Sequence, residues 1–166
     1  MTPLDELNHS PADRAAARLA ACNAADRWVA QVLADRPYPD ADAVLATGDR
    51  AARALSWADV RQALDAHPRI GDRAHGTGSE VAWSRREQAA VAGADAPTQE
   101  ALRAGNAAYE RRFGHVFLIR AAGRDPDEML AELHRRLGHD DTQEQAEVVE
   151  QLAQITRLRL ERLLTA

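Results

Sequence analysis

The 166-residue sequence contains no lysine, and all 21 of its basic residues are arginine. This absence excludes catalysis through a lysine Schiff base and covalent attachment of pyridoxal phosphate. Cysteine is almost as scarce, since Cys22 is the only one in the sequence. A single cysteine cannot form an internal disulfide or a CxxC metal pair. Because Cys22 stands in an alanine-rich helical stretch, we expect it to be a small buried side chain.

Long apolar runs are also missing. The sequence has no stretch of about 18 apolar residues, so no membrane-spanning helix and no membrane partner are expected. Its first residues, MTPLDELNHS, lack the basic and apolar regions of a secretory signal, and its last residues form no retention or peroxisomal tripeptide. We therefore expect a soluble, cytoplasmic protein. The net charge of −5, without a basic tail, argues against a nucleic-acid partner.

Helical spacing dominates what is present, and proline, serine or aspartate marks most of the expected helix starts. The predicted helices cover residues 11–22, 24–34, 40–54, 56–66, 84–92, 97–112, 125–138 and 142–164. No other run can pair with the apolar residues 113–119, which are predicted to be extended or to form a tight helical turn. The sequence thus predicts an all-α fold of about seven to nine helices, in a single compact domain over residues 1–166.

The least regular stretch, His67–Glu80, reads HPRIGDRAHGTGSE, and loops of this length are often functional. His67 ends a predicted helix, and Pro68 pushes it out of helical geometry. A helix C-terminus favours a protonated imidazole, which suits a general acid near neutral pH. The alternative is a structural histidine whose ring bonds only the last carbonyls of its helix. His75 is expected to be solvated, and a zinc pair with His67 is not expected.

Ser84, Glu87 and Gln88 stand at i, i+3 and i+4, so a hydroxyl, a carboxylate and an amide share one helical face. The same S-x-x-E spacing is a capping box, and both interpretations remain open. On the last predicted helix, Arg157 and Arg159 stand among leucines. An arginine there with a packed stem and an inward head would suit an anionic substrate. The other histidines are expected at the surface (His9, His134 and His139) or have no assigned role (His115).

Six motifs occur in a fixed order along the chain: RPY (36–38), HPRIG (67–71), WSRREQ (83–88), N-x-x-Y-x-x-RFG (106–114), FLI (117–119) and ITRLRL (155–160). This set resembles the 2-oxo-4-hydroxy-4-carboxy-5-ureidoimidazoline (OHCU) decarboxylase family over nearly the whole chain. The resemblance implies an all-α fold and conversion of OHCU, a ureide intermediate of urate degradation, to (S)-allantoin and carbon dioxide. It also implies that no cofactor or metal is needed and that the protein is a homodimer.

The resemblance assigns roles to residues as well. The family's catalytic histidine falls on His67. Its substrate-binding positions fall on Pro68, Ser84, Glu87, Gln88, Phe117, Leu118, Ile119, Arg120, Ala121 and Arg159. The segment Phe117–Ala121 would line the pocket partly through its backbone. The chain departs from the family pattern at His115-Val116, where members often have an aromatic or small residue and then proline, and at His139, where many have asparagine.

The implied chemistry needs no cofactor to accept the electron pair, because the carboxyl-bearing carbon of OHCU lies beside a C=N bond. We expect His67 to supply or relay a proton, Glu87 and Gln88 to hold the ureido group, and Arg159 to bind a carbonyl or carboxylate oxygen. Two alternatives remain: a non-enzymatic all-α interaction domain, and another ureide-processing enzyme on the same scaffold. Convergence of these side chains on one pocket would favour an enzyme.

Overall fold

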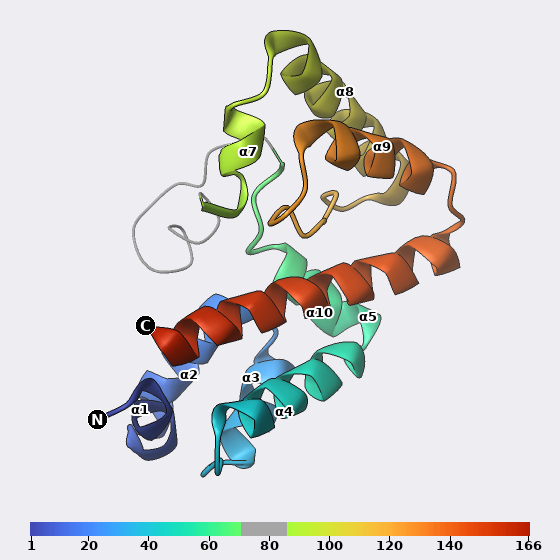
Figure 1. Cartoon of the computed structure of the whole chain (residues 1–166). Helices are drawn as coiled ribbons and strands as arrows, with labels where there is room; N and C mark the ends of the chain where they lie inside the picture. Colours follow the sequence, from blue (N-terminus) through green and yellow to red (C-terminus); the bar gives the residue numbers. More distant parts are fainter. Residues whose placement is uncertain (71–85) are drawn as a thin grey trace. The chain divides into compact units, whose positions relative to one another are not determined.

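The computed structural model describes residues 1–70 and 86–166. Its helices are α1 (Pro3–His9), α2 (Ala12–Cys22), α3 (Asp26–Ala34), α4 (Ala41–Arg53), α5 (Trp57–Leu64), α7 (Ala89–Ala92), α8 (Ala96–Phe113), α9 (Pro126–Leu137) and α10 (Asp141–Thr165) (Figure 1). These two ranges contain no strand, so the all-α prediction is confirmed, and the helices described fall within the predicted number. None of the helices described is both long and apolar enough to cross a membrane.

Side-chain caps explain where most of the helices begin. Asp40, Asp95 and Asp125 each accept a hydrogen bond of 2.8 Å from the backbone N–H three residues ahead. Ser56 caps α5 in the same way, because its hydroxyl accepts a 3.2 Å bond from the Asp59 N–H. These bonds satisfy N–H groups that have no partner inside their own helix. The predicted starts of these helices are therefore confirmed to within a residue or two.

Helix α1 is missing from the sequence-based predictions, although its start signal is present. The Thr2 hydroxyl accepts a 3.1 Å bond from the Asp5 N–H, and the Asp5 carboxylate accepts a 2.9 Å bond from the Thr2 N–H. This is a reciprocal capping box. The arginine of the RPY motif, Arg36, donates at 2.8 Å to the Leu7 carbonyl in α1. That motif therefore has a structural role at this helix.

The contacts of the chain group it into two compact units. The terminal unit comprises Met1–Ala63 and Leu152–Ala166, and the central unit comprises Leu64–Gln151. Helix α10 contributes to both, since its residues through Gln151 belong to the central unit and the rest to the terminal unit. The single domain over residues 1–166 stays a prediction.

In the terminal unit, α3 packs against both α2 and α4. Trp28 on α3 is fully buried, and its indole N–H donates to the Gly48 carbonyl at 3.0 Å. Gly48 allows a close approach there, because a Cβ on it would lie 2.5 Å from Cδ1 of Leu160. Cys22 is fully buried, as predicted.

In the central unit, α8 and α9 lie side by side (Figure 1). Gly105 makes this possible, since a Cβ at that position would overlap the Leu133 side chain. Helix α8 ends at Gly114, whose φ of 80° is the left-handed conformation that glycine adopts most easily. The glycine of the RFG motif therefore ends the helix and releases the chain into the apolar segment that follows.

One prediction in the central unit differs from the structure, and the bounds of a second are corrected. The helix expected over residues 84–92 does not run unbroken through Gln88, which takes a turn conformation with φ −98° and ψ 8° before α7 begins. Phe113 belongs to α8, whereas residues 114–121 form neither helix nor strand. The apolar run is therefore divided, because the glycine inside it stops the helix.

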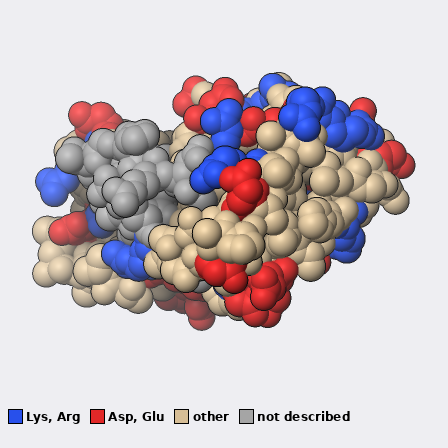
Figure 2. All heavy atoms as spheres, turned by 90° about the horizontal axis from the view of Figure 1, so that it is seen from above, with Lys and Arg blue, Asp and Glu red and all other residues tan. Residues whose placement is uncertain are grey.

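Both signs of charge are interspersed on the face of the molecule seen in Figure 2. Several arginines there and elsewhere pair with acidic side chains. Arg112 lies 2.9 Å from Asp141, and Arg18 lies 2.9 Å from Glu6. Exposed pairs of this kind contribute at most about 1 kcal/mol each. The fold therefore depends on its apolar and buried polar contacts rather than on these pairs.

Candidate active site

His67 lies just beyond the C-terminus of α5. Its backbone N–H donates to the Leu64 carbonyl at 2.9 Å, so the chain leaves the helix at this residue. The His67 side chain is half-buried, and so is that of Pro68. The prediction that His67 stands at the foot of a helix is confirmed, and its catalytic role stays a prediction.

Helix α8 holds the residues that follow His67. The Nε and Nη2 atoms of Arg69 donate to the two carboxylate oxygens of Glu110 at 2.6 and 3.2 Å. One helical turn earlier, the Nδ2 of Asn106 donates to the Ile70 carbonyl at 2.8 Å. Asn106 and Glu110 stand at i and i+4, so a single face of α8 fixes this turn. The sequence predicts both residues on a helix but does not show which groups they bind.

Glu87 and Gln88 lie directly before α7, and both side chains are half-buried, whereas their neighbour Arg86 is exposed. Partial burial is compatible with side chains that face a small ligand. Ser84 and His75 fall among residues 71–85, outside the described residues. The capping box of Ser84 with Glu87 therefore stays a prediction. The substrate-binding role of Ser84, Glu87 and Gln88 also stays a prediction.

The segment Phe117–Ala121 is buried except for the half-buried Arg120. Side chains fix its backbone in place of a helical or sheet ladder. The Arg120 N–H donates to Oε1 of Gln151 at 2.9 Å, and its carbonyl accepts a 3.0 Å bond from Nε of Arg124. Because Gln151 stands on α10, the position of the segment depends on a helix distant from it in sequence.

One apolar cluster joins the chain segments that carry most of the predicted pocket residues. Its buried members are Ile70, Val91, Leu102, Tyr109, Phe117, Ile119, Ala121, Met129 and Leu133. Ile70 follows His67 closely along the chain, and Val91 follows Gln88. The structure thus anchors the His67 turn, the Glu87–Gln88 turn and the segment Phe117–Ala121 in the same core.

Arg159 lies in the terminal unit. Its side chain is 2% exposed, and its Nη1 donates to the Ala21 carbonyl at 3.2 Å. Arg157, by contrast, is exposed and pairs with Asp49 at 2.5 Å. Of the two arginines considered, Arg159 is therefore the one whose head turns inward. Its contact with substrate stays a prediction.

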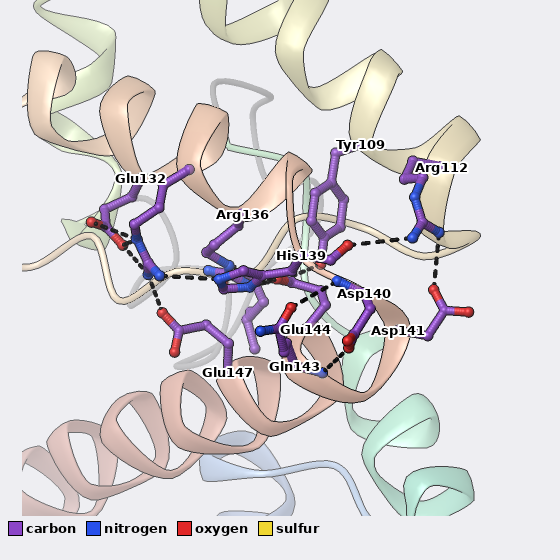
Figure 3. Close-up of polar contacts among 12 residues, drawn as sticks. Tyr109, Arg112, Glu132, Arg136, His139, Asp140, Asp141, Gln143, Glu144 and Glu147 are labelled. Atoms are coloured by element: carbon purple, nitrogen blue, oxygen red, sulfur yellow. Dashed lines mark hydrogen bonds and ion pairs between the residues drawn. The ribbon is translucent and has the colours of Figure 1, made fainter.

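A buried charged cluster in the central unit is absent from the sequence-based predictions. The side chains of Arg136 on α9 and Glu144 on α10 are 0% and 1% exposed and form an ion pair of 2.6 Å. The Tyr109 hydroxyl donates to Oε1 of Glu144 at 2.5 Å, and Nδ1 of His139 lies 3.0 Å from Oε2. Figure 3 shows these four side chains turned toward one another. Both carboxylate oxygens of Glu144 are therefore engaged.

Burial raises the pKa of Tyr109, and its hydrogen bond to Glu144 raises that pKa further. The hydroxyl therefore stays protonated and remains a donor. The prediction that His139 is a surface residue is corrected, because it is half-buried against the carboxylate of Glu144 in the turn between α9 and α10. His115, which had no assigned role, packs edge-on against Tyr109 with the ring centroids 5.5 Å apart.

Comparisons with known proteins identify a family that the chain resembles. The model of the family described as OHCU decarboxylase matches residues 8–161. Two similar proteins are named 2-oxo-4-hydroxy-4-carboxy-5-ureidoimidazoline decarboxylase. The protein from Haloferax volcanii is 29% identical over 135 residues, covering 80% of this chain and 79% of its own. The protein from Amia calva is 31% identical over 134 residues, covering 80% and 77%.

Two solved structures share the fold. The crystal structure of an OHCU decarboxylase in the presence of (S)-allantoin aligns with a TM-score of 0.74 at 24% identity, over 87% of this chain and 95% of that one. The crystal structure of an (S)-allantoin synthase aligns with a TM-score of 0.70 at 19% identity, over 99% of this chain and 54% of that one. At these identities, the alignments support the all-α architecture.

The buried ion pair leads to a stability prediction. Glu144→Gln should lower the free energy of unfolding by about 3–5 kcal/mol, because Arg136 would be left buried without its counter-ion. Glu147→Gln is the matched control: Glu147 also pairs with an α9 arginine, Arg135, but this pair is partly exposed, and its loss should cost at most about 1 kcal/mol. Urea unfolding of the two variants measures both values. Equal losses would show that burial does not distinguish the two pairs.

Proposed function

The chain belongs to the OHCU decarboxylase family, and we propose that it converts 2-oxo-4-hydroxy-4-carboxy-5-ureidoimidazoline to (S)-allantoin and carbon dioxide. The relatives from Haloferax volcanii and Amia calva carry the name of this activity. One structural observation carries the proposal for this chain. The His67 turn, the Glu87–Gln88 turn and the segment Phe117–Ala121 are anchored in a common core of the central unit, which supports the proposal that His67, Glu87 and Gln88 serve one site.

The substrate supplies the electron sink for its own decarboxylation. As the bond between the ring carbon and the carboxylate breaks, its electron pair forms a C=C bond to the neighbouring ring carbon, the π pair of the adjacent C=N bond moves onto nitrogen, and the nitrogen takes a proton. Carbon dioxide leaves, and the product of this step is an enol. The enol then loses its hydroxyl proton and gains a proton on carbon. Delivery of that proton to one face gives a single enantiomer.

We assign the proton steps to His67. It lies just beyond the end of α5, and Pro68 restricts the backbone beside it. A positioned imidazole can give and take protons near neutral pH. His67 is half-buried, so part of the residue stays accessible to a bound ligand.

The remaining roles concern binding. Glu87 would accept hydrogen bonds from the ureido N–H groups, and the amide of Gln88 would donate to the ureido carbonyl, with Ser84 and Pro68 completing this side. The segment Phe117–Ala121 would form a wall of the pocket. Arg159 would bind a carbonyl or carboxylate oxygen through a charge-assisted hydrogen bond. Holding the carboxylate out of the plane of the ring would favour bond cleavage by orientation.

We further propose that the two units work as one domain, since the family match runs through both without interruption. We also propose that the protein acts in the cytoplasm and that this small ureide is its partner, with no nucleic acid or membrane involved. The resemblance to the family further implies a homodimer. Sedimentation velocity tests the last point: the expected species has twice the 18.1 kDa mass of one chain. A monomer at micromolar concentration would contradict it.

The activity itself is tested by generating OHCU from urate with the two preceding enzymes and following circular dichroism. Spontaneous decay gives racemic allantoin, whereas this protein should produce a rapidly growing (S)-allantoin signal. His67→Ala and His67→Asn should lower the rate by about 100- to 10,000-fold with the helical spectrum unchanged, because the proton donor is lost.

His134→Asn is the control for this experiment, since His134 is an exposed histidine on α9 and its replacement should leave the rate unchanged. If the wild-type protein neither accelerates the decay nor biases its product, the proposed function is wrong.

Glu87→Ala should raise KM by about 10- to 100-fold with a smaller effect on kcat, because a charge-assisted hydrogen bond to the substrate contributes about 1.5–3 kcal/mol. The exposed neighbour Arg86 supplies the control, and Arg86→Ala should leave KM unchanged. Steady-state kinetics measures both variants. Unchanged kinetics together with a lower melting temperature for Glu87→Ala would instead assign Glu87 to the capping box alone.

A further inference from the structure

The buried pair of Arg136 and Glu144 makes more contacts than an ion pair requires. Nε and Nη2 of Arg136 both donate to Oε1 of Glu144, at 2.9 and 2.6 Å. The remaining terminal nitrogen, Nη1, turns to a different target and donates to the Leu118 carbonyl at 2.7 Å. The guanidinium carbon also lies 4.5 Å from the centre of the Phe117 ring. Arg136 therefore contacts two consecutive residues of the segment Phe117–Ala121.

Stability alone does not account for these charges. Removing a guanidinium and a carboxylate from water costs several kcal/mol per ion, and apolar side chains of similar volume are often as stabilising as a buried ion pair. Tyr109 and His139 add donors to Glu144, so further polar groups are committed to the same site (Figure 3). What an apolar replacement could not supply is the hydrogen bond to the Leu118 carbonyl.

That hydrogen bond matters because residues 117–121 have no helix or strand of their own. Their backbone is held by side chains from other elements: Arg136 on α9 binds the Leu118 carbonyl, and Gln151 on α10 binds the Arg120 N–H. The planar guanidinium spans Glu144 and Leu118 at once, which an ammonium group cannot do with the same geometry. The orientation of Arg136 is set by Glu144, and it in turn sets the position of the Leu118 peptide.

We propose that Arg136, oriented by Glu144, is a positioning residue that holds the backbone of Phe117–Ala121 in the place where it lines the substrate pocket. The proposal rests on the proposed function, since it concerns the same site. Arg136 acts through the Leu118 carbonyl rather than by touching substrate. A wall displaced by an ångström costs an enzyme up to about 100-fold in rate, so loss of this contact reduces catalysis even when the fold survives.

The adjacent residue of α9 provides a matched control. Arg135 also links α9 to α10, through Glu147, but its side chain is 47% exposed. Among the described residues, Arg135 contacts the side chains of Glu132, Glu147 and His139 and no backbone group of Phe117–Ala121. Arg135→Lys and Arg136→Lys therefore make the same chemical change at neighbouring positions, and only the second breaks the bridge to Leu118.

Kinetics of the two variants tests the proposal, at temperatures where circular dichroism shows both to be folded. Arg136→Lys should lower kcat/KM by about 10- to 100-fold and weaken the binding of (S)-allantoin, followed by NMR titration. The Ile119 amide resonance should also shift, because the Leu118 carbonyl belongs to the same peptide group. Arg135→Lys should change kcat/KM by less than about twofold and leave the Ile119 resonance in place.

A second variant keeps the test decisive if Arg136→Lys is too unstable. Tyr109→Phe/Arg136→Met/Glu144→Leu replaces the polar cluster with apolar side chains, which can preserve the fold. It should remain helical and cooperative in thermal unfolding while losing activity and (S)-allantoin binding. A folded variant of either kind with wild-type kinetics and wild-type (S)-allantoin affinity would overturn the positioning role. Failure of the wild-type protein to turn over OHCU would instead overturn the proposed function.

Discussion

The segments that carry the predicted pocket residues lie largely outside regular secondary structure, so side-chain hydrogen bonds must fix their backbones. Asn106 on α8 holds the Ile70 carbonyl, and Arg136 on α9 holds the Leu118 carbonyl. A buried carbonyl without a partner is costly, so each of these donors both stabilises the fold and sets a local geometry. The shape of the candidate site therefore depends on helices whose own side chains need not touch a ligand.

The helices themselves were largely predictable, because the interactions that define them are local. Aspartate and serine caps and proline in first turns act within four residues of the helix start. Helix α1 has the same local signals, since Thr2 and Asp5 form its capping box, so it too could have been predicted from the sequence. The break at Gln88 is a different case. The spacing of Ser84, Glu87 and Gln88 fits both a capping box and a continuous helical face, so the sequence does not show where the helix is interrupted.

The buried charges could not be predicted in this way. Arg135 and Arg136 are adjacent and identical in type, yet one is exposed and the other fully buried. Which of them turns inward depends on the rotation of α9 against α8 and α10, a tertiary property that no local pattern records. The burial of His139 against Glu144 is likewise a tertiary property, so the sequence alone predicts it wrongly as a surface residue. The family resemblance pointed to the pocket residues, whereas the residues that support them became visible only through their partners in space.

The face of α8 that carries Asn106, Tyr109 and Glu110 has a consequence for how a ligand would be received. These residues hold the Ile70 carbonyl, the carboxylate of Glu144 and the side chain of Arg69. The turn after His67 and the polar cluster next to Phe117–Ala121 are thereby both bonded to the same helix. A tilt of α8 would therefore displace both together. Two parts of a pocket that are held by the same helix keep their spacing during thermal motion. A ligand that binds there therefore pays little entropy for ordering them. Such a site would be preorganised, with its dimensions set when the chain folds.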